Sequence, residues 1–109
     1  MVLAVHNSLT RRKEVFEPLA EGKVGMYVCG VTVYDRSPLG HAKSAINFDL
    51  IVRWLRYRGY DVRHVTNFTD VDDKIIARAN EMGIDPLKLS GDMIKEYNDD
   101  MARLKVKRA

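Results

Sequence analysis

The chain has 109 residues, of which 46% are hydrophobic and 30% charged, with a formal net charge of +3 and a sequence pI near 9.1. This length suits one domain, and the composition excludes a disordered chain. The single cysteine, Cys29, excludes an internal disulfide, and no apolar run reaches the roughly eighteen residues of a membrane span. We therefore expect a soluble, cytoplasmic domain with no membrane segment. The mild positive charge fits a polyanionic ligand without requiring one.

Two strands are predicted in the first thirty residues. Residues 2–5 are apolar and end at the polar residues 7–8, which favours a short strand. Residues 10–14 are polar and charged, so we expect a surface turn there. Residues 24–29 contain the β-branched and aromatic residues Val24, Tyr27 and Val28 and stop at Gly30, which predicts a buried strand.

The longest helical pattern opens at Gly40 and stops at Gly59. Its apolar residues recur at helical spacing and are expected to face the core. They are Ile46, Leu50, Ile51, Trp54 and Leu55. Asp49 and Arg53 lie on the opposite face as a favourable i,i+4 pair. The alternation over residues 61–68 predicts a second buried strand.

A shorter helix is predicted to start within residues 69–73. Asp70 is the expected cap for its backbone N–H groups, and Asp72 and Asp73 suit the positive end of the helix dipole. The expected inner face is Ile75, Ile76 and Ala79. Gly83 is the expected stop, because a left-handed glycine commonly ends a helix.

A last helix is predicted from the pair Asp85-Pro86, a cap residue followed by proline at the first helical position. Its apolar stripe is expected to be Leu87, Ile94, Tyr97, Met101 and Leu104. Ser90 and Gly91 weaken its middle by roughly 1 kcal/mol. The basic residues 105–108 are interpreted as the end of this helix.

The order strand, helix, strand, helix indicates a right-handed βαβ unit, and therefore an α/β fold with a parallel sheet. Such sheets need several strands and helices on both faces. Since two or three strands cannot cover themselves, residues 1–109 are expected to form one incomplete layer of a domain. An uncovered sheet edge also predicts that the free chain associates with itself.

Residues suited to ligand binding follow the first buried strand, at the edge where ligands bind in open α/β sheets. Gly30 and Gly40 let backbone approach a ligand, and the helix start after Gly40 offers N–H groups to phosphate. Thr32 and His41 add donors, and the Cys29 thiolate is a type of metal ligand. Taken singly, Cys29 suits a buried apolar position and His41 a polar surface position. Neither G-x-G-x-x-G nor a P-loop lysine motif occurs.

Four blocks together resemble cysteinyl-tRNA synthetases. Residues 25–35 (GMYVCGVTVYD) resemble the first active-site segment, and residues 38–41 (PLGH) occupy the place of the HIGH-type signature. Residues 67–79 (NFTDVDDKIIARA) are similar to a second family block, and residues 7–13 (NSLTRRK) to the opening strand and turn. The resemblance implies that residues 1–109 are the N-terminal portion of a class I synthetase catalytic domain. That portion is the first half of a Rossmann-like (HUP-type) parallel-sheet nucleotide-binding domain.

The implied activity is that of a cysteine–tRNA ligase, in which ATP, with Mg²⁺, activates cysteine to the adenylate before transfer to tRNA(Cys). The resemblance makes Cys29 the first protein ligand of a Zn²⁺ that binds the substrate thiolate and so favours cysteine over serine. Gly30, Thr32 and Thr69 would line the cysteine pocket. The implied ATP-binding turn is Pro38, Leu39, Gly40 and His41. No side chain acts as a nucleophile, because positioning and electrostatics carry this reaction.

Two departures from the family pattern leave other functions open. Pro38 replaces the leading histidine of the signature, and losing one such donor typically costs about 10²–10³-fold in rate. Zinc needs three or four protein ligands, and the family's remaining Cys, His and Glu ligands lie downstream of Ala109. One alternative is therefore a stand-alone, non-catalytic paralogue that binds nucleotide, tRNA or a partner protein. A further alternative is the cysteine ligase of mycothiol synthesis, which shares the Cys-Gly-x-Thr turn.

Overall fold

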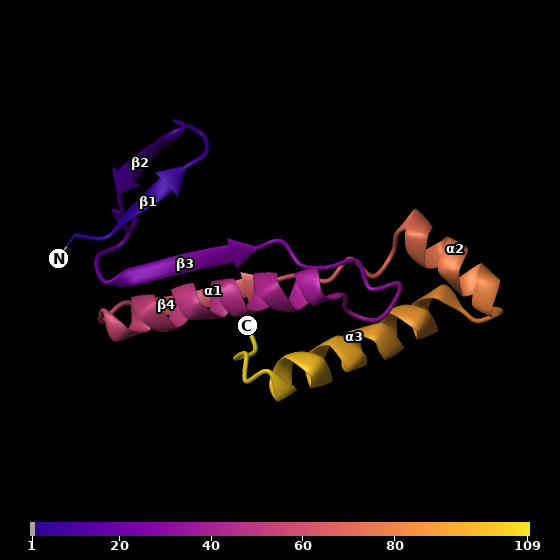
Figure 1. Cartoon of the computed structure of the whole chain (residues 1–109). Helices are drawn as coiled ribbons and strands as arrows, with labels where there is room; N and C mark the ends of the chain where they lie inside the picture. Colours follow the sequence, from indigo (N-terminus) through magenta and orange to yellow (C-terminus); the bar gives the residue numbers. More distant parts are fainter. Residues whose placement is uncertain (1) are drawn as a thin grey trace.

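The computed structural model describes residues 2–109. Its elements are β1 (Ala4–Asn7), β2 (Arg12–Val15), β3 (Lys23–Val28), α1 (Leu39–Tyr57), β4 (Asp61–Thr66), α2 (Asp73–Met82) and α3 (Pro86–Arg103). The molecule is elongated, 55 × 31 × 24 Å, with the β1–β2 hairpin near one end and α2 at the other (Figure 1). Among the helices of the described chain, none combines the length and the apolar character of a bilayer span.

The central unit is β3, α1 and β4, and its two strands run parallel. Lys23–Val28 pairs in register with Asp61–Thr66. This confirms the predicted α/β fold with a parallel sheet. Both strands end one or two residues earlier than predicted, and an isolated parallel bridge between Thr32 and Thr69 resumes the pairing farther on.

Residues 10–14 were expected to form a surface turn, and this expectation is wrong for their second half. They lead into β2, which pairs antiparallel with β1, itself placed two residues later than predicted. The Glu14 carboxylate accepts hydrogen bonds from the Thr10 hydroxyl at 2.7 Å and the Asn7 amide at 3.2 Å, and these bonds lower its pKa. Cross-strand partners of this kind let a charged segment form an edge strand.

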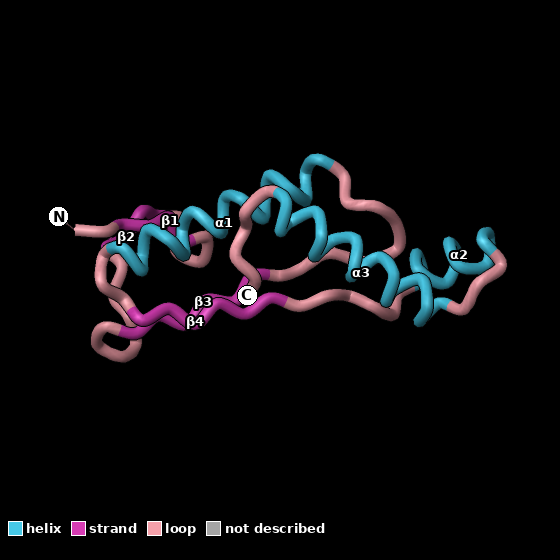
Figure 2. The backbone as a smooth tube through the Cα atoms, turned by 90° about the horizontal axis from the view of Figure 1, so that it is seen from below, coloured by secondary structure: helices cyan, strands magenta, loops and turns pink. Residues whose placement is uncertain are grey.

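Helix α1 covers one face of the two-stranded sheet (Figure 2). Its buried residues Val52 and Leu55 pack with Val24 and Val62 of the strands to form one core. Of the apolar face predicted for this helix, only Leu55 is buried. The other members are exposed: Ile46, Leu50, Ile51 and Trp54. Two strands are too narrow to cover a helix of 19 residues with apolar side chains on more than one side.

The opposite face of the sheet has none of the described elements over it (Figure 2). Side chains alternate between the two faces of a strand, so Tyr27 and Val65, which are paired in register, both point to this face. Both are exposed. The sheet is therefore the incomplete layer that the sequence predicts, and self-association of the free chain stays a prediction.

Helix α2 is capped by Asp72, whose side chain accepts from the Lys74 N–H at 3.2 Å, and not by Asp70 as predicted. The reason is that pairing extends to Thr69, so the helix begins later than the sequence signal suggests. At its other end, Gly83 adopts the predicted left-handed conformation with φ of 67°. The buried face contains Ile75 and Ala79, whereas Ile76 is exposed.

Helix α3 begins as predicted, with Asp85 as its cap and Pro86 in its first turn. The predicted stripe is partly wrong, because Leu87 and Leu104 are exposed while Leu89 is buried. Leu89 completes a second core with Val33 of the loop and Ile75 and Ala79 of α2. Ser90, expected to weaken the helix, is buried and donates to the Asp70 carbonyl at 2.7 Å and the Pro86 carbonyl at 3.0 Å.

The segment after α3 is fastened to α1 by the ion pair that the sequence predicts. Asp49 accepts from Arg53 Nε at 2.7 Å through one oxygen and from the Lys107 N–H at 3.0 Å through the other. Arg53 in turn donates from Nη2 to the Lys105 carbonyl at 2.7 Å. Only 12% of the Asp49 side chain is exposed, whereas 44% of the Arg53 side chain is. Hydrogen bonds that involve a charged group are stronger than those between neutral groups. We call residues 105–107 with Asp49 and Arg53 the α1 clamp.

Replacing Asp49 tests the energetic weight of the α1 clamp. We expect Asp49→Ala to lower the free energy of unfolding by about 2 kcal/mol, because it leaves the Lys107 N–H without its acceptor and removes one of the two acceptors of the Arg53 guanidinium. Asp49→Asn keeps an acceptor and should lose less. Urea unfolding of the two variants beside the original chain measures this, and equal stability of all three would contradict it.

Candidate functional site

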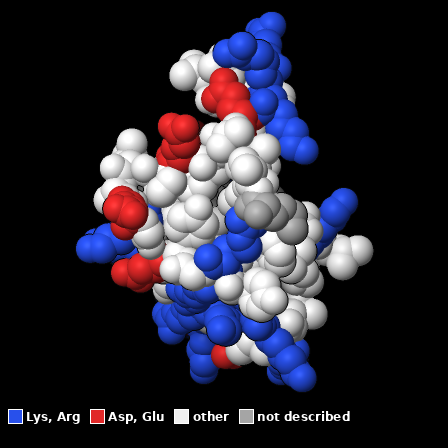
Figure 3. Space-filling view, turned by 90° about the vertical axis from the view of Figure 1, so that its left-hand side faces the viewer, with Lys and Arg blue, Asp and Glu red and all other residues white. Residues whose placement is uncertain are grey.

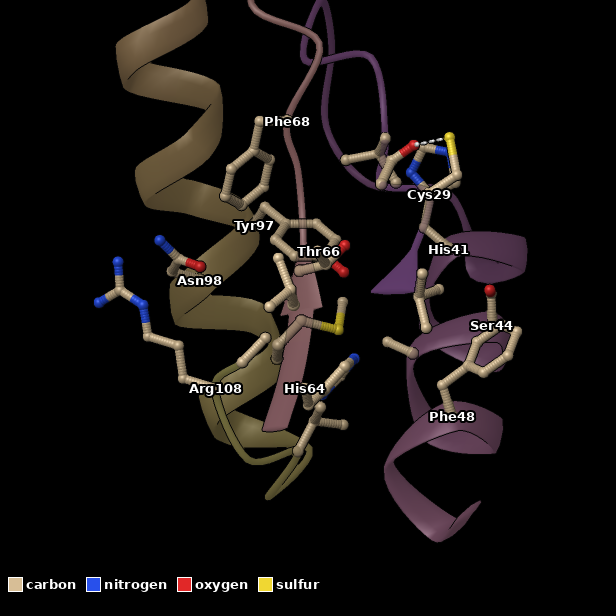
Figure 4. Close-up of a pocket in the computed structure, with 18 of the residues that line it drawn as sticks. Cys29, His41, Ser44, Phe48, His64, Thr66, Phe68, Tyr97, Asn98 and Arg108 are labelled. Carbon is tan, nitrogen blue, oxygen red and sulfur yellow. Dashed lines mark hydrogen bonds between the residues drawn. The ribbon is translucent and has the colours of Figure 1, made fainter. Parts of the chain in front are cut away.

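A pocket of about 980 Å³ lies beyond the carboxyl ends of β3 and β4. Helices α1 and α3 form its facing walls, and β4 lies between them (Figure 4). His41, Ser44 and Phe48 reach it from α1, and Tyr97 and Asn98 from α3. This is the edge of the sheet at which the sequence predicts a ligand. The pocket thus collects residues that are far apart in the sequence.

The turn after β3 brings Cys29, Gly30 and Thr32 to the pocket. Cys29 is exposed, and its Sγ lies 3.8 Å from the Gly30 carbonyl, which accepts a weak hydrogen bond from the thiol. The interpretation of Cys29 as a buried apolar residue is therefore wrong. Gly30 lies directly against β4, because a Cβ built on it would overlap the backbone carbonyl of Asn67. The close approach predicted for Gly30 is thus made by the protein's own backbone.

Substituting Gly30 should displace this turn. We expect Gly30→Ala to lower the free energy of unfolding by about 1–3 kcal/mol, because the methyl group overlaps backbone that cannot rotate away. Gly91→Ala is the matched control, since a Cβ at Gly91 meets no atom within 4 Å. That control should raise stability slightly, by up to about 1 kcal/mol, as alanine does in a helix interior. Chemical denaturation compares them, and a loss no larger than that of the control would contradict the expectation.

Thr32 and Thr69, the predicted pair of the cysteine pocket, lie side by side through their backbones. The Val33 N–H donates to the Thr69 carbonyl at 3.2 Å, and the Thr69 N–H donates to the Val31 carbonyl at 3.0 Å. Thr32 lines the large pocket, whereas Thr69 is half-buried and does not line it. The structure therefore brings the two residues together but places one of them in the pocket wall.

The predicted ATP turn occupies the start of α1. Pro38 is extended and makes no side-chain capping bond, Leu39 begins the helix, and the Pro38 carbonyl accepts from the His41 N–H at 3.0 Å. Of the four predicted residues, His41 lines the large pocket, while Leu39 lines a smaller hollow of about 360 Å³. Gly40 is exposed with open space around its Cα. The helix N-terminus is thus free to receive an anion.

Other residues of the pocket were not singled out from the sequence. Phe68 and Tyr97 meet edge to face at a ring distance of 5.4 Å, and burial raises the pKa of the Tyr97 hydroxyl. Lys74 reaches the pocket from α2 and lies 5.9 Å from the Tyr34 ring. Tyr97 was assigned to the core stripe of α3, and its helical spacing gave no sign that the stripe borders a cavity.

His64 lines the pocket, and its surroundings affect its charge. Its Nε2 is buried and accepts no hydrogen bond from the described residues. Burial lowers its pKa below the ordinary 6.5, the Arg56 charge lowers it further, and Asp49 opposes both. His64 is therefore neutral near pH 7 and sits on the sheet face that α1 covers.

The His64 pKa predicts a pH dependence of stability. Between its lowered pKa and 6.5 the unfolded chain binds more protons than the folded chain, so stability rises with pH across that window. We expect the free energy of unfolding to fall as the pH is lowered from about 7.5 to about 5.5. His64→Gln should remove that part of the slope. Glu14, which titrates below 4.5, lies outside this range, and an unchanged slope in the variant would contradict the assignment.

Charge is unevenly distributed over the molecule. On the end that carries the hairpin, Lys and Arg side chains outnumber acidic ones (Figure 3). Exposed basic residues of that part include Arg11, Arg12 and Lys13. Within residues 2–109, no group of three or more His, Cys, Asp or Glu side chains is arranged to hold a metal ion. Cys29 is thus not part of a set of three or more such donors within the described chain.

Comparison with known families identifies the family of the chain. The family model described as tRNA synthetases class I (C) catalytic domain matches residues 15–109. The chain belongs to this family. The matched residues include the turn after β3, the start of α1 and all of α2 and α3.

Cysteine–tRNA ligases of several organisms are similar to the chain over nearly its full length. A cysteine–tRNA ligase of Syntrophotalea carbinolica is 58% identical over 104 residues, which are 95% of this chain and 22% of that protein. One of Thermococcus onnurineus is 56% identical over 109 residues, covering all of this chain and 23% of that protein. The chloroplastic/mitochondrial enzyme of Arabidopsis thaliana is 56% identical over 102 residues, 94% of this chain and 18% of that protein. The chain thus spans about a fifth of the length of these curated relatives.

Proposed function

We propose that this chain forms part of a cysteine–tRNA ligase that uses ATP to activate cysteine and transfers it to tRNA(Cys). The observation that carries the proposal is the meeting of Cys29, Gly30, Thr32 and His41 at one pocket beyond the carboxyl ends of β3 and β4. Relatives at 56–58% identity carry that enzyme's name, which supports the assignment. A cytoplasmic location, expected from the lone cysteine, stays a prediction.

Each part of the pocket has a role in this proposal. The turn with Cys29, Gly30 and Thr32 receives the amino acid, and Thr69 supports Thr32. The exposed N-terminus of α1 and the His41 side chain face the phosphates of ATP, where donors stabilise the charge that develops as the cysteine carboxylate attacks the α-phosphorus. Pyrophosphate leaves, and Mg²⁺ accompanies the nucleotide. Holding the two substrates in line replaces a protein nucleophile.

Zinc fits this pocket only in part. An exposed thiol at the pocket wall is a suitable donor, but a stable zinc site needs three or four protein ligands. Residues 2–109 do not bring two further His, Cys, Asp or Glu donors to Cys29. We therefore propose Cys29 as one ligand of a zinc site that the described residues do not complete.

A non-catalytic binding paralogue is the second candidate, and Pro38 is the observation that favours it. At the start of α1, a proline offers no side-chain donor to a phosphate, whereas His41 and the helix N–H groups still do. Such a protein would bind nucleotide or tRNA without forming the adenylate. The mycothiol-type ligase, the third possibility, would use an amino sugar in place of tRNA.

Cysteine-dependent ATP–pyrophosphate exchange tests the proposal in the natural full-length protein. We expect Cys29→Ser to lower the exchange rate at least about 100-fold, because serine oxygen is a poorer ligand for soft metals than thiolate. Ser8→Ala, in the exposed hairpin turn, should leave the rate unchanged. Pro38→His should raise it by restoring a donor.

The outcomes separate the candidates. Exchange that requires cysteine and falls in Cys29→Ser supports the ligase, and transfer to tRNA or to an amino sugar then distinguishes the two ligases. Nucleotide or tRNA binding without any exchange favours the non-catalytic paralogue. Equal rates in Cys29→Ser and the unaltered protein would contradict the role of Cys29.

A further inference from the structure

The two parallel strands do not continue evenly into the pocket. Regular pairing ends at Val28 with Thr66 and resumes at Thr32 with Thr69. Three residues, 29–31, therefore lie opposite two residues, 67–68. One extra residue on one strand makes a bulge, and bulges beside binding sites redirect a side chain. Cys29 is the first residue of this bulge and is exposed.

The Asn67 side chain holds the bulge from the opposite strand. Its Oδ1 accepts a hydrogen bond from the Gly30 N–H at 2.7 Å and another from the Tyr27 hydroxyl at 2.9 Å. A continuing strand would have offered a backbone carbonyl to the bulged N–H, and here the side-chain amide takes that place. Both donors come from β3 or the turn that follows it, so one oxygen ties the end of β3 to the end of β4.

The backbone of Asn67 confines the same residue from a second side. Its carbonyl lies where a Cβ of Gly30 would be, and Thr66 Oγ1 lies 3.2 Å from that position. Asn67 thus confines Gly30 with both its main chain and its side chain. A shift of Asn67 would move Gly30, and with it the flanking Cys29.

We propose that Asn67 is a positioning residue for the amino-acid site. It fixes the bulge at residues 29–31, which directs Cys29 and sets the distance to Thr32. The identity of the ligand as cysteine rests on the proposed function. The positioning itself depends only on the geometry of the two strand ends.

Amide hydrogen exchange of Gly30, followed by NMR in the 109-residue chain, tests the positioning directly. Asn67→Ala removes the acceptor, and we expect the Gly30 N–H to exchange about tenfold faster, the effect of losing one hydrogen bond. Asn67→Asp retains an acceptor oxygen and should keep Gly30 within about twofold of the original. The Ile76 N–H, bonded to the Asp72 carbonyl, is the internal reference and should not change.

Further variants distinguish a local effect at Gly30 from a general loss of folding. Tyr27→Phe removes the other donor to the same oxygen and should leave Gly30 protected. If Asn67→Ala does not fold, Asn67→Ser, whose hydroxyl is too short to reach Gly30, replaces it and should show the same acceleration. Unchanged exchange of Gly30 in the variant without an acceptor would overturn the proposal. Equal acceleration in Asn67→Asp would overturn it too, because the acceptor would then be irrelevant.

A second measurement connects the bulge to the ligand. In the natural full-length protein, Asn67→Ala should raise KM for cysteine about tenfold in pyrophosphate exchange, leave KM for ATP unchanged, and be rescued by Asn67→Asp. An equal rise in both KM values would overturn a role specific to the amino-acid site. If the unaltered protein shows no cysteine-dependent exchange, the proposed function fails, while the exchange of the Gly30 amide still decides whether Asn67 fixes the bulge.

Discussion

Parallel pairing of β3 with β4 is the constraint on which the site depends. The two strands are more than thirty residues apart in the sequence, and their register brings the residues after Val28 beside those after Thr66. Every predicted amino-acid-site residue lies just beyond these two strand ends. The crossover helix α1 then starts at the same edge, because a parallel connection must return its chain to the far end of the sheet. One register thus places a thiol, a glycine turn and a helix N-terminus around one pocket.

Local signals in the sequence predicted much of this architecture. Gly59, Gly83 and the Asp85-Pro86 pair marked helix ends correctly, because each acts through its own backbone conformation or cap. The cap of α2 was misassigned to Asp70, since three aspartates offer the same chemistry and only the bridge at Thr69 chooses among them. Strand β2 was missed because cross-strand partners stabilise it, and these cannot be read from its own charged residues.

The residues of the candidate site could be proposed from the sequence, but their arrangement in space could not. Cys29, Gly30, Thr32 and His41 were recognisable as a group from the family resemblance, and the structure brings them to one pocket. The wall formed by α3 was not predictable, because helical periodicity marks an apolar stripe without saying what it faces. The same limit explains α1, where Ile46 and Leu50 were interpreted as core residues yet are exposed. An apolar stripe identifies a helix face that another element can cover, but which element covers it depends on the tertiary structure.

The separation of the two cores has a mechanical consequence. One core joins α1 to the sheet, and the other joins α2 and α3 to the loop at Val33. The pocket lies between these two cores, which are joined by the strand ends on one side and by the α1 clamp on the other. Its width therefore depends on how the two cores are placed relative to each other. A ligand that touches both walls adds a further connection between them.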